Sequence, residues 1–236
     1  MDFSILIGII GVVTSVLMFL SQWGTVRKIM AARTSQEFAA TSFLAAFLNC
    51  LIGLLYGIPM VCPDNIVVLV VNAIGLLAES IYLLVFLVYS DMYTRIPIVA
   101  TIYLELLAGG IVGLLFFKLP HGANRVDAAS HLCVIVGMFM FGAPISDLTK
   151  AWKLKSNAHM PLLPCIGSLV NCIVWVSYFS IRRSYILVIP NTIGLLVGGV
   201  QVFTHYRFSH LAHPAVHASD PARDEQTVPL NQERDS

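Results

Sequence analysis

The sequence predicts an all-α membrane protein in which seven transmembrane helices form two parallel three-helix bundles joined by a fourth, linker helix. The first observation is composition: the 236 residues are 57% hydrophobic and 11% charged, whereas a soluble domain has about 25% charged residues. The second is a series of seven apolar runs, each close to the roughly 20 helical residues that cross a bilayer core of about 30 Å. The third is a repeat that relates the first three runs to the last three.

The apolar runs are separated by short polar links. They cover residues 3–22, 42–60, 66–89, 96–117, 129–147, 162–181 and 184–206. Residues 3–22 lack a preceding basic segment and a small-x-small cleavage site, so we expect a retained first span rather than a signal peptide. Residues 208–236 are polar, with mixed charge and three prolines, and we expect them to form a disordered cytosolic tail.

Basic residues in the links predict the orientation in the membrane. One side carries Arg27, Lys28, Arg33, Arg95, Lys150, Lys153, Lys155 and Arg207, whereas the other carries only Lys118, Arg125, Arg182 and Arg183. Because cytosolic loops are enriched in Lys and Arg, we expect the N-terminus outside and the C-terminus in the cytosol. The plasma membrane is the expected location, and an intracellular membrane remains an alternative.

An internal repeat is the most informative feature of the chain. Asn72 in "VNAIGLL" corresponds to Asn191 in "PNTIGLL", and five of the seven positions are identical. Two further matches lie about 120 residues apart, namely "NCLIGLLYG" at 49–57 with "NCIVWVSYF" at 171–179, and "RKIMAARTSQEF" at 27–38 with "TKAWKLKSNAHM" at 149–160.

These matches divide the chain into a first repeat at 1–90, a linker helix at 91–127 and a second repeat at 128–207. Because the linker adds one span, both repeats enter the membrane in the same direction. Parallel repeats related by an axis along the membrane normal are typical of transporters.

Asn72 and Asn191 are the first candidates for a binding site. An amide is costly to bury in a membrane, and equivalent residues of the two repeats are expected to face each other across the symmetry axis. Each amide offers two donors and an acceptor oxygen, which suits a neutral polyol. The alternative is that each amide ties helices together; the repetition favours a ligand site.

Gly53 aligns with Trp175, which predicts an asymmetric slot in which an aromatic face packs on a sugar ring. An interfacial position for Trp175 is the open alternative. Glu79 and Glu105 are the acids that lie well inside apolar runs. Either is a candidate for proton coupling, although we favour a carboxyl that is satisfied by a neighbouring helix.

The chain resembles the SWEET sugar transporters, the eukaryotic seven-span type of the MtN3/saliva, Pro-Gln-loop superfamily. The resemblance covers residues 3–208 and is carried by "FLSQWGTVRKIMAARTSQEF" (19–38), "NCLIGLLYGIPMVCPDN" (49–65), "VVNAIGLL" (70–77), "FGAPISDLTKAWKLKSNAHMPLLP" (141–164) and "YILVIPN" (185–191). It implies that Asn72 and Asn191 hydrogen-bond the sugar, with Trp175 and Gly53 above it.

The resemblance also implies hinges and a gate. Family members carry hinge prolines near one end of spans 1, 2, 5 and 6; Pro144 and Pro161 match these positions, whereas Gln22 and Ser42 replace the first two. The extracellular gate of the family pairs a tyrosine, matched by Tyr56, with an acidic residue that aligns with Ser184. We therefore expect altered gating and a weaker gate in this chain.

Taken together, these features predict bidirectional, energy-independent transport of a mono- or disaccharide such as glucose or sucrose by alternating access. We expect no enzymatic activity, no cofactor or bound metal and no nucleic-acid partner, since Lys and Arg are not clustered on a basic face. The lipid bilayer is a partner, and assembly with copies or relatives is left open. The alternatives are a proton-coupled amino-acid carrier of the Pro-Gln-loop type and, less favoured, a seven-span receptor.

Overall fold

The computed structural model describes residues 3–35, 38, 40–63, 65–119, 122–156 and 162–209. These residues form eight α-helices and no strand: α1 Phe3–Ala32, α2 Thr41–Gly57, α3 Ile66–Val88, α4 Met92–Lys118, α5 Ala123–Phe139, α6 Gly142–Leu154, α7 Leu162–Ile181 and α8 Tyr185–Ser209. The predicted tail lies outside the described residues from position 210 onward, and α8 includes its first two residues.

The helices supply the seven predicted spans. Six spans are long and apolar enough to cross a membrane, with α5 and α6 counted as one span from Asn124 to Leu154. The shorter apolar helix α2 has 17 residues, which corresponds to about 26 Å of helix and reaches the lower limit for a span.

Local chemistry explains where several helices begin and end. Ile58, after α2, is extended with ψ 132° because it precedes Pro59 and a proline disfavours a helical residue before it. α4 begins after Asp91, whose carboxylate accepts a hydrogen bond from Thr94 N at 3.3 Å. α1 ends just before Arg33 and α6 just before Lys155. These two residues are equivalent in the repeat and have φ 52° and 48°.

The fifth span, predicted over 129–147, is broken into α5 and α6. After α5, the amides of Met140 and Phe141 bond to carbonyls only three residues back, at 3.2 and 3.3 Å. Pro144 follows in the first turn of α6 and has no N–H to donate to the Met140 carbonyl. The span therefore crosses as two helices, with the interruption next to Phe141.

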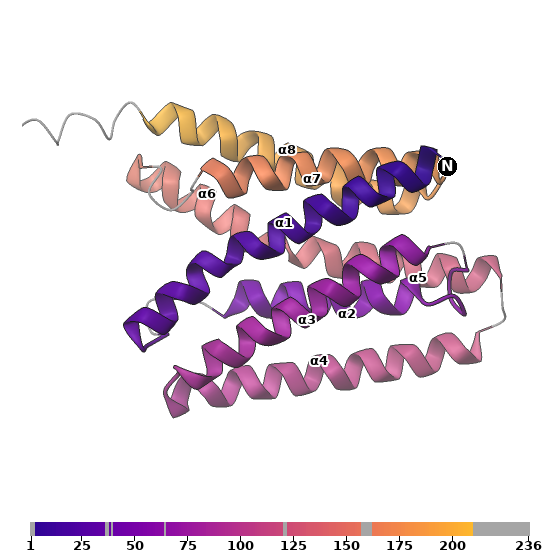
Figure 1. Cartoon of the computed structure of the whole chain (residues 1–236), viewed down its shortest axis with the longest axis horizontal. Helices are drawn as coiled ribbons and strands as arrows, with labels where there is room; N and C mark the ends of the chain where they lie inside the picture. The colour runs from indigo at the N-terminus through magenta and orange to yellow at the C-terminus, as the bar shows by residue number, and fades with distance from the viewer. Residues whose placement is uncertain are drawn as a thin grey trace, which may run out of the picture.

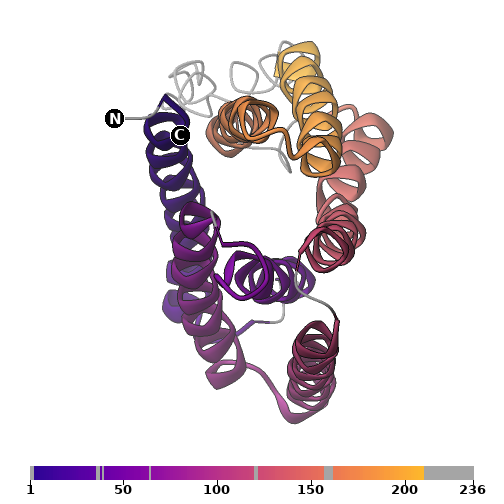
Figure 2. The same ribbon diagram turned by 90° about the vertical axis from the view of Figure 1, so that its right-hand side faces the viewer.

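Six spans form a ring, with the order of contacts α1–α3–α2–α5–α8–α7 and back to α1. α3 lies between α1 and α2 in the first bundle, and α8 contacts α5, α6 and α7 in the second (Figures 1 and 2). α4 lies outside the ring against α2, where Gly109 faces Leu51. The ring brings the two bundles together at two seams, α1 with α7 and α2 with α5.

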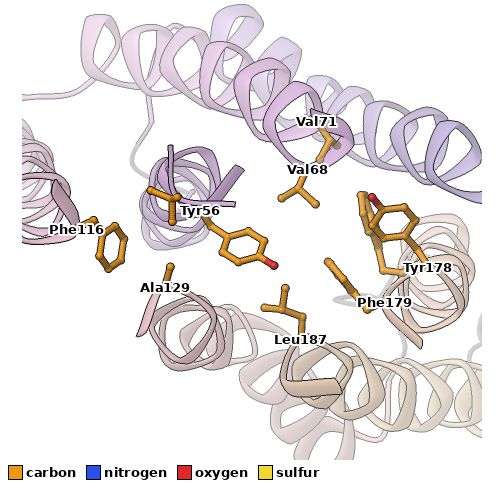
Figure 3. Packing of buried hydrophobic residues seen from close by; sticks show 10 residues of the cluster. Tyr56, Val68, Val71, Phe116, Ala129, Tyr178, Phe179 and Leu187 are labelled. Carbon is orange, nitrogen blue, oxygen red and sulfur yellow. The ribbon is translucent and has the colours of Figure 1, made fainter. Parts of the chain in front are cut away.

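The two ends of the ring differ in their packing. At one end, which we term the closed end, a single core contains residues of both bundles, and Tyr56, Val68, Phe179 and Leu187 point toward one another from four helices (Figure 3). At the other, the divided end, the described residues form separate cores: one around Phe86 in the first bundle and one around Ala151 and Cys165 in the second.

Candidate functional site

A cavity of about 340 Å³ lies inside the ring, and residues of α1, α2, α3, α5, α6, α7 and α8 line it. It brings together six of the predicted site residues: Gly53, Tyr56, Asn72, Pro144, Trp175 and Asn191. None of the described residues that line it carries a formal charge. The cavity is therefore suited to a polar but neutral molecule.

Asn72 and Asn191 have the same geometry in the two bundles. Asn72 Nδ2 donates to the Val68 carbonyl at 2.8 Å, and Asn191 Nδ2 donates to the Leu187 carbonyl at 2.9 Å. Each bond runs back along the same helix to the carbonyl four residues earlier, which fixes the amide plane. One N–H and the acceptor oxygen of each amide have no hydrogen-bond partner among the described residues, so both amides remain able to bind a ligand.

Gly53 allows the Asn72 amide to lie against α2. A Cβ atom at Gly53 would lie 2.6 Å from Asn72 Cγ and 2.7 Å from Nδ2, which is closer than non-bonded atoms approach. A larger side chain does not fit at Gly53, because the Asn72 amide occupies the space that it would need. This explains why Gly53 and its equivalent Trp175 differ in size.

Trp175 forms part of the seam between the bundles. Its indole Nε1 donates to Ser15 Oγ on α1 at 3.0 Å, and its ring covers Gly11, where a Cβ would lie 3.2 Å from Cζ2. On its own helix it stacks on Phe179 with ring centroids 5.4 Å apart. The indole is 7% exposed, so it lines the cavity as a fixed wall rather than as a free side chain.

A second pair of amides, Asn49 and Asn171, also lines the cavity. Asn171 Oδ1 accepts from Thr14 Oγ1 at 2.8 Å and from Ser15 Oγ at 3.0 Å, which leaves its Nδ2 without a partner in the described part of the chain. Sequence analysis did not assign this pair, although the repeated "NC" at 49–50 and 171–172 was the signal.

The repeated glycines serve helix packing. A Cβ on Gly75 would lie 2.6 Å from Cys50 Sγ and would also collide with Phe19. On Gly194 it would lie 2.7 Å from Cys172 Sγ and 3.2 Å from Phe141. The same contact among a glycine, a cysteine and a phenylalanine therefore occurs once in each bundle, and the glycine lies three residues after the matching asparagine.

A hydrogen-bonded chain joins the two bundles at the closed end. Asn65 Nδ2 donates to the Tyr56 hydroxyl at 2.9 Å, and Asn65 Oδ1 accepts from the Tyr178 hydroxyl at 3.2 Å. Asn65 is 2% exposed. The Tyr56 hydroxyl thus bonds to Asn65 rather than to Ser184, which is half-buried and whose amide bonds to the Phe179 carbonyl. Sequence analysis missed Asn65 and Tyr178, although Tyr56 and Tyr178 are equivalent in the repeat.

The remaining predicted residues that the structure describes do not line the cavity. Gln22 is half-buried on α1 and donates from Nε2 to Glu79 Oε1 at 2.7 Å. Ser42 is exposed in the first turn of α2, and Pro161 lies outside the described residues. Glu79 and Glu105 are buried and do not line the cavity.

Comparison with known proteins places the chain in a family. The model of a family described as "Sugar efflux transporter for intercellular exchange" matches residues 5–93 and 128–212. The bidirectional sugar transporter SWEET7b of Oryza sativa subsp. japonica is 34% identical over 202 residues, which are 85% of this chain and 76% of the relative. The bidirectional sugar transporter SWEET4 of Arabidopsis thaliana is 33% identical over 199 residues, 84% of this chain and 79% of the relative.

The fold has a counterpart among solved structures. The structure of a eukaryotic SWEET transporter at 3.7 Å resolution superposes with a TM-score of 0.82 and 24% identity, covering 88% of this chain and 97% of that one. The two segments that the family model matches cover most of the two bundles and leave out most of α4. By its sequence and its fold, the chain belongs to the family of sugar efflux transporters for intercellular exchange.

Proposed function

We propose that the chain is a membrane carrier that moves a neutral mono- or disaccharide in both directions by alternating access, without ATP or an ion gradient. The observation that carries this proposal is the uncharged cavity between the bundles, with the paired amides Asn72 and Asn191 in matching geometry. The relatives named bidirectional sugar transporters support it.

In the proposed complex, the sugar lies across the pseudo-two-fold axis. The unpartnered oxygens of Asn72 and Asn191 accept hydrogen bonds from hydroxyl groups, and their remaining N–H groups donate to hydroxyl oxygens. The second pair, Asn49 and Asn171, adds donors elsewhere in the cavity lining, and Trp175 offers an apolar wall. A typical net hydrogen bond contributes about 0.5–1.5 kcal/mol, so a few such bonds give the weak affinity that a carrier needs to release its substrate.

Alternating access then follows from the two ends of the ring. Opening the closed end requires Tyr56, Asn65 and Tyr178 to part, while closing the divided end requires the separate cores of the bundles to meet. We take the bundles at 1–90 and 128–207 as the moving units and the segment 91–127, which contains α4, as their linker. With the basic links at the divided end facing the cytosol, the conformation is open inward.

The proposed setting is the plasma membrane, with the N-terminus outside and the C-terminus in the cytosol. No catalytic step or cofactor enters this mechanism. Glucose and sucrose are the candidate substrates.

A proton-coupled amino-acid carrier is the rival function. It needs groups that bind an ammonium and a carboxylate, and the residues described around the cavity offer neither a cation nor an anion. It also needs a proton-carrying acid near the substrate, whereas Glu79 and Glu105 lie outside the cavity lining. We therefore favour the sugar.

The test is uptake of labelled glucose, sucrose and a panel of amino acids into liposomes that contain the purified protein. We expect uptake of at least one sugar down its gradient, and faster exchange when the same unlabelled sugar is present on the other side. Amino-acid uptake that collapses with the proton gradient, with no sugar uptake, would contradict the proposal.

A further inference from the structure

Glu79 is the most deeply buried acid of the described chain that the proposed sugar site does not use. It is 0% exposed in the middle of α3. Gln22 donates to its Oε1 at 2.7 Å, and its Oε2 has no hydrogen-bond partner among the residues that the structure describes. The ion pair found among the described residues joins Lys150 and Asp147, so none of the described Lys, Arg or His side chains forms an ion pair with Glu79.

The bond between Gln22 and Glu79 belongs to a contact that fixes one wall of the cavity. Phe19, one helical turn before Gln22, lines the cavity, and its ring lies against Gly75. The Phe19 carbonyl accepts a hydrogen bond from the Tyr82 hydroxyl at 3.0 Å. Tyr82 and Gly75 flank Glu79 on the same face of α3, so three contacts hold the segment from Phe19 to Gln22 on α3.

The second bundle has no equivalent of this bond. The repeat relates Gln22 to Pro144 and Glu79 to Gly198; neither residue has a polar side chain. The equivalent of Phe19 is Phe141, which lies at the interruption between α5 and α6 and also lines the cavity. Phe19 thus stands on a continuous helix that is tied to its neighbour, whereas Phe141 stands on a broken one.

We propose that Glu79 is a positioning residue of the carrier: with Gln22 it ties α1 to α3 and holds Phe19 as a fixed part of the cavity wall. Phe141 is then the part that moves. This role rests on the proposed sugar transport. It depends on the reach of the side chain and on an acceptor oxygen, not on a charge, because an uncompensated carboxylate is strongly disfavoured in a membrane interior.

Two substitutions of Glu79 separate a tie from a proton-coupling group. Glu79→Gln keeps the length and the acceptor oxygen but cannot ionise, whereas Glu79→Asp keeps the ionisable group on a shorter stem that cannot reach Gln22. The titratable groups near Glu79 are Cys50 on α2 and Tyr82 on α3, and both remain in these variants. Sugar uptake by the purified variants in liposomes is measured over a range of pH.

We expect Glu79→Gln to keep the maximal rate and the pH profile of the parent. Glu79→Asp should lose about tenfold in maximal rate, equivalent to about 1.4 kcal/mol, with KM changed less than about twofold because Glu79 does not line the cavity. A proton-coupling role predicts the reverse, with Asp active and Gln inactive, and that result would overturn the proposal.

Gln22→Met tests the same tie from α1 if Glu79→Asp does not fold, because it removes the donor and leaves Glu79 unchanged. We expect the same loss of maximal rate, with Glu105→Gln as a control acid outside the tie that transports like the parent. Parental rates in both Glu79→Asp and Gln22→Met would also overturn the proposal. A parent protein that moves no sugar would instead refute the proposed function, and with it this role.

Discussion

The two bundles share a layer of matched residues at the cavity and differ in the helices that support this layer. Asn72 and Asn191 bond to their own helices at 2.8 and 2.9 Å, and three residues further along each helix a glycine packs against a cysteine. Behind this matched layer, α1 is one helix of 30 residues tied to α3 by Gln22 and Glu79. Its counterpart is split into α5 and α6. We infer that a shared ligand keeps this layer matched, whereas only the second bundle can bend at a break within one of its spans.

Removing either member of the matched pair should have the largest effect. Asn72→Ala and Asn191→Ala each delete one or two hydrogen bonds of about 0.5–1.5 kcal/mol, so sugar affinity should fall about tenfold for each 1.4 kcal/mol lost. Affinity is measured on purified, monodisperse protein. Thr192→Ala is the matched control, because Thr192 is an exposed neighbour whose hydroxyl bonds to Val188 O. Parental affinity in both asparagine variants would mean that the amides only tie helices together.

Adding one carbon at Gly53 should displace the Asn72 amide, so that its geometry no longer matches that of Asn191. In Gly53→Ala the new Cβ would lie 2.6 Å from Asn72 Cγ, so the amide must turn away and uptake should drop several-fold. Gly199→Ala is the control, since a Cβ there meets nothing within 4 Å and Ala favours a helix over Gly by about 1 kcal/mol. Uptake assays with matched expression check both variants; equal uptake by the two would contradict the steric role.

Joining α5 and α6 into one continuous helix should make the fifth span as stiff as α1. Pro144→Ala supplies the missing N–H at the break, so α5 and α6 can join and the maximal rate should fall more than the affinity. Ser42→Ala, at an exposed position in the first turn of α2, should leave both unchanged. Rates are compared by sugar counterflow in liposomes. A slower Ser42→Ala than Pro144→Ala would show that the hinge lies elsewhere.

Deleting one hydroxyl at the closed end should have a smaller effect. Tyr178→Phe removes the bond to Asn65 at 3.2 Å, which weakens the closed end by about 0.5–1.5 kcal/mol. Cys62 lies beside these hydrogen-bonded side chains, with Asn65 Nδ2 3.2 Å from its sulfur. In a background in which the other cysteines are replaced, Tyr178→Phe should therefore make a maleimide label Cys62 faster. Tyr185→Phe, an exposed tyrosine in the first turn of α8, is the control. Unchanged labelling in Tyr178→Phe would remove Asn65 from the gate.

Changing the proton gradient should have the smallest effect of all. The described cavity lining contains no acid, so uptake of a neutral sugar should vary less than about twofold between weakly acidic and neutral pH. An uncoupler should leave it unchanged. Abolished uptake under the uncoupler would favour the proton-coupled alternative.

The sequence predicted the membrane spans best and the hydrogen-bond partners of side chains least well. Apolar runs predicted every span because hydropathy is a local property, although α1 continued to Ala32 through a basic segment. The repeat predicted that Asn72 and Asn191 meet at one site, and both line the cavity. The role of Asn65 was invisible, since it depends on Tyr178, which is 113 residues away.

By itself, the sequence determined an all-α membrane protein with a repeat and a polar pair in apolar surroundings, because the cost of burying polar and charged groups in lipid applies to each segment separately. Only the tertiary structure decided which side chains satisfy one another: Trp175 with Ser15 and Gln22 with Glu79. These bonds join helices that are distant in the chain, and their geometry depends on how the ring closes. The sequence pattern predicts that a polar side chain is buried, whereas the packing of the helices determines which atom it bonds to.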